Sequence, residues 1–133
     1  MPPDPATIRI ARLWLQCARG NLIRASAPRS PGVYWEDICF DAQQAAEKAL
    51  KAVLVYYGIS LCRVHDLAEL LTLGKSEIAP LPARIRAAAG LTVYAVQTRY
   101  PGTYPPVTAR EARQATRTAE RVVVWVEGSI LFT

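Results

Sequence analysis

The sequence predicts an all-α protein, built as an up-and-down four-helix bundle with one additional short helix. Apolar residues recur every three or four positions through most of the chain, which is the spacing of an amphipathic helix. No stretch alternates apolar and polar residues before a tight hairpin turn, so no β-sheet is expected. Clusters of Pro and Gly separate the periodic segments, and such short connections favour antiparallel neighbours.

Length and composition limit the possible classes of protein. A chain of 133 residues fits a single domain, here residues 1–133, and 51% apolar against 20% charged residues is typical of a chain that folds. The net charge of +5 comes mainly from Arg, whose planar fork suits phosphate and carboxylate groups. An anionic partner is therefore plausible, although many soluble domains are mildly basic without one.

Cysteine and histidine usage argues against a metal site. The three cysteines are widely spaced without a CxxC pair, and one His is too few to complete a ligand set, so we expect neither a metal nor another cofactor. The start of the chain lacks the basic and apolar regions of a secretory signal, and no apolar run of about 18 residues is present. We expect a cytoplasmic protein that does not enter a membrane.

The first helix is predicted from about Pro5 to Ala25. Asp4 is a suitable N-cap, and Pro5 suits the first helical position. Gly20 and Asn21 form a weak point late in this helix. Apolar side chains recur at seven-residue spacing at Ile8, Leu15 and Leu22.

The second helix, from Trp35 to Tyr57, has the strongest pattern in the chain and should end at Gly58. One face is apolar and consists of Ile38, Ala42, Ala45, Ala49, Val53 and Tyr56. A second stripe is polar and consists of Asp37, Asp41, Gln44, Lys48 and Lys51. This polar stripe is most simply interpreted as a face in contact with solvent.

Two helices are predicted in the next part of the chain. A short one runs from about Asp66 to Leu73 and stops at Gly74. A longer one begins after Pro82, although Gly90 and the β-branched residues that follow weaken it. Its apolar face would consist of Ile85, Ala89, Val93 and Val96.

The last helix is introduced by Thr108 and Glu111, which have the spacing of a capping box. The apolar run from Val122 to Val126 has strand propensity, but the preceding cap favours a helix. The apolar seam consists of Ala112, Ala115, Ala119, Val122, Val126 and Ile130. A basic face consists of Arg110, Arg113, Arg117 and Arg121. Such a face commonly serves solubility, but arginines at helical spacing also match a phosphate backbone.

Two other segments of the sequence carry side chains that could act in acid-base catalysis or bind phosphate. His65 beside Asp66 is a candidate general base, or a hydrogen-bond donor to a phosphate group. Alternatively, Asp66 caps a helix and His65 packs against a neighbouring element. Arg99 has Tyr94 and Tyr104 nearby, so its fork is placed to hold a phosphate while a ring stacks on a base. Alternatively, Arg99 neutralises carbonyl groups at the end of a helix.

Several segments together resemble the HEPN domain family (higher eukaryotes and prokaryotes nucleotide-binding). The run FDAQQAAEKALKA at residues 40–52 is similar to the signature second helix of that family, and His65-Asp66-Leu67 is similar to its next element. LTVYAVQTRYPG at residues 91–102 resembles its Arg-Tyr-Pro motif, and the capped last helix also fits. The likeness runs in order from Ile8 onward, and it implies a four-helix bundle.

The resemblance also implies functions. HEPN proteins usually dimerise, are associated with nucleotide binding and metal-independent RNA cleavage, and some accompany a small nucleotidyltransferase as toxins or substrate-binding subunits. The nuclease branch carries an Arg followed four to six residues later by His. Here Arg99 matches that Arg, but Tyr104 stands five positions later. Tyr titrates near pH 10 and is a poor proton shuttle at neutral pH, so this difference weighs against nuclease activity.

These observations favour a binding module over an enzyme. We expect a homodimer that binds a nucleotide or RNA and that can act with a small nucleotidyltransferase. The expected site residues are Arg99, Tyr94, Tyr104, Gln44, Lys48, Lys51, His65 and Asp66. The alternatives are a metal-independent endoribonuclease toxin of a toxin-antitoxin pair, with catalytic candidates His65, Arg99 and Tyr104, and a structural subunit without a ligand.

Overall fold

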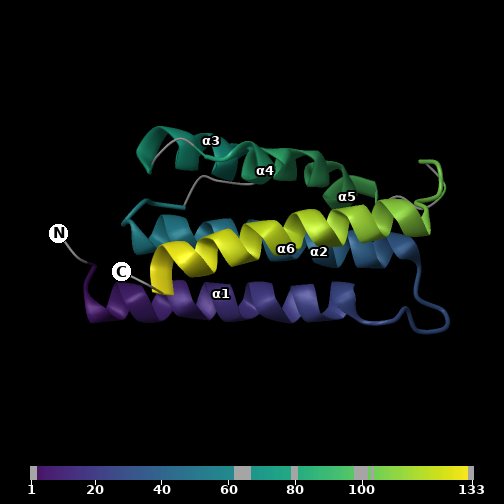
Figure 1. Cartoon of the computed structure of the whole chain (residues 1–133), viewed down its shortest axis with the longest axis horizontal. Coiled ribbons are helices and arrows are strands. Elements are labelled where there is room, and N and C mark those ends of the chain that lie inside the picture. Colours follow the sequence, from purple (N-terminus) through teal and green to yellow (C-terminus); the bar gives the residue numbers. More distant parts are fainter. Residues whose placement is uncertain (1–2, 62–66, 79–80, 98–101, 103, 132–133) are drawn as a thin grey trace.

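The prediction of an all-α fold is confirmed. The computed structural model describes residues 3–61, 67–78, 81–97, 102 and 104–131, and every regular element in these ranges is a helix (Figure 1). The elements are α1 (Pro5–Ser26), α2 (Trp35–Tyr56), α3 (Leu67–Glu77), α4 (Ala83–Arg86), the 3-10 helix η1 (Ala87–Leu91), α5 (Thr92–Gln97) and α6 (Ala109–Leu131).

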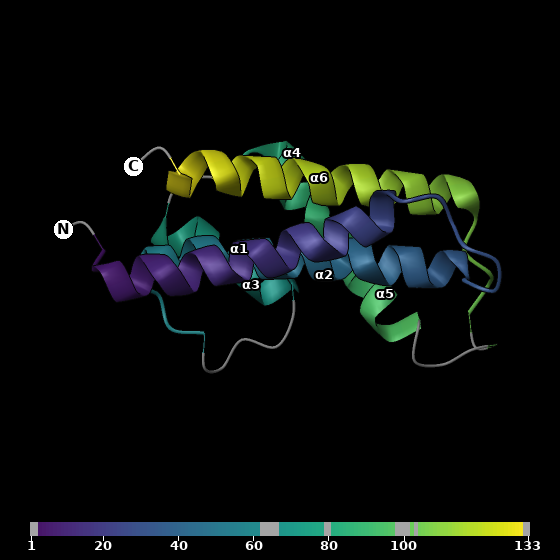
Figure 2. The same ribbon diagram turned by 90° about the horizontal axis from the view of Figure 1, so that it is seen from below.

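Three long helices and one segmented layer form the bundle. Helix α2 packs against both α1 and α6, and α3 and α5 cover it on the side away from α1 (Figure 1). The long helices α1 and α2 are antiparallel, and α6 ends near the beginning of α1 (Figure 2). The buried apolar side chains form one continuous core, to which each of these layers contributes.

Helix α1 begins and ends close to the predicted positions. The Asp4 carboxylate accepts a hydrogen bond of 2.8 Å from the Thr7 amide, and Pro5 occupies the first turn. The helix passes through Gly20 and Asn21 without a break. It ends at Ser26, since Ala27 is extended, as the residue before a proline prefers to be.

Helix α2 lies at the centre of the bundle because small residues line its inner face. All six residues of the predicted apolar face are buried, and its three alanines, Ala42, Ala45 and Ala49, are completely so. Alanine side chains let neighbouring helices approach closely. At the other end, Gly58 adopts φ +77 and its amide donates to the Val55 carbonyl at 2.9 Å, which terminates the helix as predicted.

The region between α2 and α6 differs from the prediction in two ways. Helix α3 continues past Gly74 to Glu77, because Gly74 is a buried position packed beneath Leu81 rather than a helix end. The predicted helix after Pro82 is instead divided into α4, η1 and α5. Gly90 and the β-branched pair after it disfavour a continuous α-helix, as their propensities indicate.

This division changes which face of the segment is buried. The residues in the core are Ile85, Ala88 and Leu91, whereas Val93 is 43% exposed. A spacing of three residues matches the 3.0 residues per turn of a 3-10 helix, which stacks such side chains on one side. The predicted face built on Ala89 and Val93 is therefore wrong, because it assumed the α-helical period.

Helix α6 follows the prediction closely. The Thr108 hydroxyl accepts a hydrogen bond of 3.1 Å from the Glu111 amide and so caps the first turn. Every residue of the predicted apolar seam is buried. The run Val122 to Val126 is helical despite its strand propensity, since the helix buries Val122, Val123 and Val126 in the common core.

Candidate anion-binding site

The polar stripe of α2 faces solvent at Asp37, as predicted, but is covered by α1 at Asp41. Asp41 is only 6% exposed, and it accepts a hydrogen bond of 3.0 Å from the Asn21 side-chain amide of α1. Arg24, also in α1, lies 3.4 Å from the other carboxylate oxygen of Asp41. The interpretation as a solvated face is wrong at this position, because α1 covers it and supplies polar partners.

The predicted ligand-binding residues of this stripe also contact other side chains of the protein. The Lys48 ammonium donates to the Asn21 side-chain oxygen at 2.8 Å, and the Lys51 ammonium lies 5.1 Å from the centre of the Trp14 ring. The Gln44 amide donates to its neighbours Gln43 and Glu47 within α2. These cations and amides therefore join α1 to α2 or bond within α2.

Tyr94 lies on the opposite side of α2 from Lys48. Its hydroxyl donates a hydrogen bond to the Cys39 thiol of α2. Cys39 and Lys48 are nine residues apart, which is about two and a half helical turns, so their side chains leave α2 on opposite sides. Burial raises the pKa of the Cys39 thiol to about 12, and the Glu111 carboxylate adds to the effect. Burial likewise raises the pKa of Tyr94 to about 12, and both groups are neutral at physiological pH.

The surroundings of Tyr94 do not suit a phosphate by themselves. A hollow of about 240 Å³ lies between this tyrosine and α6, and its only charged lining residue among those the structure describes is Glu111. Tyr104 is 40% exposed in the connection before α6 and does not line that hollow. His65, Asp66 and Arg99 lie outside the described residues, so their predicted roles remain predictions.

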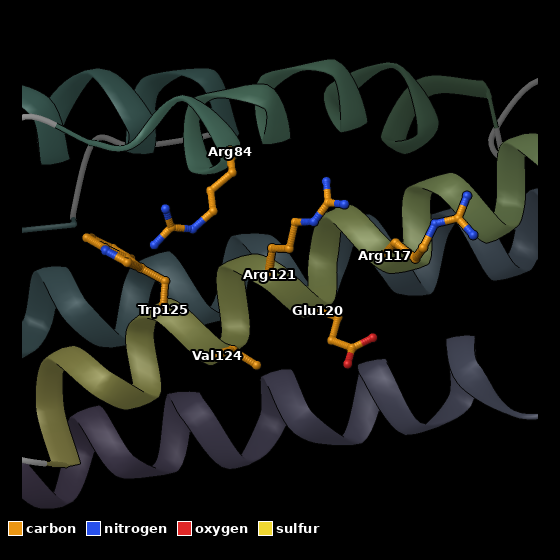
Figure 3. A pocket seen from close by; sticks show the side chains of 6 residues that line it. All are labelled: Arg84, Arg117, Glu120, Arg121, Val124 and Trp125. Atoms are coloured by element: carbon orange, nitrogen blue, oxygen red, sulfur yellow. The ribbon is translucent and has the colours of Figure 1, made fainter.

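A basic hollow elsewhere on the bundle is better suited to an anion. It has a volume of about 350 Å³ and lies between α4 and the second half of α6 (Figure 3). We call it the α4–α6 hollow. Its lining consists of Arg84, Arg117, Glu120, Arg121, Val124 and Trp125.

In the α4–α6 hollow, the positively charged side chains lie on the side of α6 that faces α4. Arg84 extends from α4 toward Trp125, and Arg121 rises from α6 toward α4 (Figure 3). Glu120 extends to the other side of α6, toward α1 (Figure 3). Within the part of the chain that the structure describes, the arginines of this hollow form no ion pair, so their charges are available to a ligand.

The spacing of the arginines along α6 is unfavourable for the helix itself. Arg113, Arg117 and Arg121 follow one another at four-residue intervals, and like charges at this spacing destabilise a helix by about 0.2–0.5 kcal/mol per pair. An anion held between them would relieve that repulsion. Arginine forks bind phosphate in a bidentate manner, and an indole ring stacks on a nucleobase, so this arrangement can hold both parts of a nucleotide.

Two arginines of the α4–α6 hollow were predictable as part of a basic face. Arg117 and Arg121 belong to the predicted basic face of the last helix, but Arg84 and Trp125 were not predicted as site residues. The sequence contains no sign of this site, because Arg84 is far from α6 in the chain. Only the packing of α4 on α6 brings Arg84 to the same hollow as Arg121 and Trp125.

Neither a metal site nor a membrane span is found in the ranges that the structure describes. No group of three or more His, Cys, Asp or Glu side chains there is placed to hold a metal ion. None of the helices in those ranges is long and apolar enough to cross a membrane.

The fold and the hollow together define a small helical bundle with a basic surface site, and comparison with known proteins identifies its family. The model of the HEPN domain matches residues 11–129. The crystal structure of ST0689, an archaeal HEPN homologue, is similar with a TM-score of 0.71 and 33% sequence identity, over 90% of this chain and 97% of that one. No curated protein matches the chain. The chain belongs to the HEPN family.

Proposed function

We propose that this HEPN protein is a nucleotide- or RNA-binding module whose phosphate site is the α4–α6 hollow. One observation carries the proposal: Arg84, Arg117 and Arg121 line one hollow from two helices without an ion-pair partner among the described residues, and Trp125 borders it. Charge-assisted hydrogen bonds from arginine to phosphate are among the stronger polar contacts in proteins.

Family membership supports further parts of the proposal. We propose that the protein acts as a homodimer and associates with a small nucleotidyltransferase. Arg99, with Tyr94 and Tyr104, remains a second candidate for phosphate binding, on the strength of the Arg-Tyr-Pro motif. A toxin role with RNA cleavage is the alternative function, and a structural subunit without a ligand is the other.

Matched charge-removing variants test the phosphate site. ATP and a fluorescein-labelled hexanucleotide RNA would be titrated into the wild-type protein and into Arg84→Gln, Arg121→Gln and Arg110→Gln. Arg110 is on α6 and exposed but does not line the hollow, so Arg110→Gln controls for the loss of one positive charge. Each charge-assisted contact contributes about 1.5–3 kcal/mol, so we expect a ten- to hundredfold weaker Kd for the first two variants.

The same titrations separate the alternatives. Equal weakening by all three variants would contradict a specific site and indicate general attraction to anions. Arg99→Gln would be titrated as a fourth variant, and weakening by this variant alone would indicate that the phosphate binds at the Arg-Tyr-Pro motif instead. Shortening of the labelled RNA on a gel during incubation with EDTA would identify a metal-independent ribonuclease. No binding of either probe would favour a structural subunit.

A further inference from the structure

A second hollow of similar size lies on the other side of Arg117. It has a volume of about 380 Å³ and is formed where the end of α1 and the following connection meet the start of α2 and the first half of α6. We call it the α1–α6 hollow. Its lining includes Arg29, Trp35, Arg113 and Arg117, together with apolar and hydroxyl side chains from α1, α2 and α6.

The α1–α6 hollow repeats the chemistry of the α4–α6 hollow. The Arg29 guanidinium lies 4.4 Å from the centre of the Trp35 ring, and its Nη1 donates to the Val33 carbonyl at 2.9 Å. These two contacts hold the guanidinium in place. Like the arginines of the first hollow, Arg113 forms no ion pair with any residue the structure describes. Both hollows thus combine arginines with a tryptophan.

Arg117 connects the two hollows, because it lines both. From Arg113 to Trp125 the face of α6 covers twelve residues, or about 18 Å at 1.5 Å per residue. A stacked nucleic-acid strand rises about 3.4 Å per nucleotide, so this length corresponds to about five nucleotides. A mononucleotide is too short to reach both tryptophans.

On the basis of the proposed function, we propose that the ligand is a single-stranded oligonucleotide that follows α6 and occupies both hollows. Its phosphates contact the arginines in series, with Arg117 in the middle, and a base is received at each end, by Trp125 and by the Arg29–Trp35 pair. Single strands offer unstacked bases to aromatic and guanidinium groups, whereas a duplex keeps its bases paired inside. The two tryptophan-lined hollows therefore favour a single strand.

A length series tests this proposal. AMP, a trinucleotide and a hexanucleotide of adenosine, and a six-base-pair RNA duplex would be titrated into the wild-type protein. We expect the hexanucleotide to bind at least a hundredfold more tightly than AMP, with an intermediate trinucleotide and a duplex weaker than the hexanucleotide. Equal affinity for AMP and the hexanucleotide would overturn the two-hollow proposal while leaving nucleotide binding at one hollow intact.

Variants at the two ends make the test specific. Arg29→Gln and Arg84→Gln each remove one cation from one hollow, and Arg12→Gln removes an exposed cation of α1 that lines neither. For the hexanucleotide, we expect each end variant to weaken binding about tenfold and Arg12→Gln to have little effect. For AMP, no more than one end variant should matter. An unchanged Kd of the hexanucleotide for Arg29→Gln would contradict occupation of the α1–α6 hollow.

Tryptophan fluorescence gives a readout that does not depend on affinity. The chain has three tryptophans, and in a Trp14→Phe background the variants Trp35→Phe and Trp125→Phe each leave one reporter. The hexanucleotide should quench both reporters, and AMP at most one. Equal competition by polyglutamate and by the hexanucleotide would overturn the proposal in favour of an acidic protein partner. Loss of binding for every nucleotide probe would overturn the proposed function itself.

Discussion

Asp41 shows how one residue can change the interpretation of a whole helix face. Its carboxylate, at 6% exposure, is held by Asn21 and Arg24 of α1, and Asn21 also accepts from Lys48. A buried carboxylate without partners would be costly, so the polar residues of the two helices depend on each other. This interdependence fixes the position of α1 along α2.

A double-mutant cycle tests the coupling between the two helices. Asp41→Ala should lower the free energy of unfolding by about 1–3 kcal/mol, because it leaves the Asn21 amide without its acceptor. Asn21→Ala should cost a similar amount. Urea unfolding of both variants and the double variant should give a coupling energy of about 0.5–3 kcal/mol. Strictly additive effects would mean that the two side chains act independently.

The buried pair of Cys39 and Tyr94 makes stability depend on alkaline pH. The pKa of each group is raised to about 12 in the folded protein, while a cysteine in the unfolded chain titrates near 9. Above pH 9 the unfolded chain therefore loses the thiol proton and the folded protein keeps it. The stabilising contribution is complete below pH 9 and is lost as the pH rises toward 12.

Urea unfolding at pH 8, 9 and 10 would measure this effect. We expect the free energy of unfolding to fall across the series, by no more than about 1.4 kcal/mol per pH unit for the thiol. Cys39→Ala removes the thiol and should give a shallower decline, while Cys17→Ala changes an exposed cysteine and serves as the control. Parallel declines for wild type and Cys39→Ala would show that the thiol is not responsible.

Individual site residues were the least predictable feature of the sequence. Arg117 and Arg121 could be recognised from helical spacing alone, since both lie in one continuous helix. Arg84 and Trp35 could not, because their contribution depends on which helices pack together. Lys48 was also a predicted site residue, and its ammonium donates to the Asn21 side-chain oxygen of α1, a contact that the sequence does not reveal.

Glycine ends one helix of the bundle and lies inside another. Gly58 terminates α2 with φ +77, whereas Gly20 lies inside α1, where an added Cβ would meet no atom within 4 Å. A side chain at Gly58 would be forced into the left-handed region, and one at Gly20 would not. The same residue type therefore has opposite roles in the two helices.

The pair Gly20→Ala and Gly58→Ala turns this contrast into a prediction. Gly20→Ala should raise the free energy of unfolding by about 0.4–1 kcal/mol, because alanine favours the helix and restricts the unfolded chain. Gly58→Ala should lower it by about 1–2 kcal/mol. Thermal and urea unfolding of both variants would provide the values. A destabilising Gly20→Ala would indicate that the α1 backbone needs glycine there for another reason.

Helix boundaries could be predicted where the local signals agree, and not where they conflict. In α1 and α2 the apolar period and the signals at the helix ends agree, and the predicted ends lie within about one residue of those observed; the predicted cap likewise marks the start of α6. Between Pro82 and Gln97 they disagree. There η1 packs against α6 and α2 as a 3-10 helix. A search for the 3.6-residue period of an α-helix does not predict such a segment.

At the scale of the whole molecule, the bundle was predictable because it depends on several independent patterns rather than on one. The apolar faces of α2 and α6 each specify a buried surface, and short connections leave few ways to combine them. The positions of surface side chains relative to one another are not specified by any repeated pattern in the sequence. A small rotation of α4 would remove Arg84 from its hollow without any change in the apolar pattern.

The outer face of α1 carries exposed apolar side chains that suit the interface of the expected homodimer. Ile10 and Leu13, at 47% and 53% exposure, and the exposed Cys17 follow one another at helical spacing, and none of them packs against the core. An exposed apolar stripe of this kind is favourable to bury against a second copy, which presents the same surface in a symmetric pair. None of these residues lines either hollow.

Light scattering at micromolar concentration should therefore give the mass of a dimer for the wild type and of a monomer for Leu13→Glu. Ile23→Glu introduces the same charge at an exposed apolar position on a different side of α1, and should leave the dimer intact. A monomeric wild type, or a dimeric Leu13→Glu, would contradict an interface on this face. Because the stripe and the hollows share no residue, the Leu13→Glu monomer should still bind the hexanucleotide with wild-type affinity per protomer; a tenfold loss would instead mean that the second protomer completes the binding site.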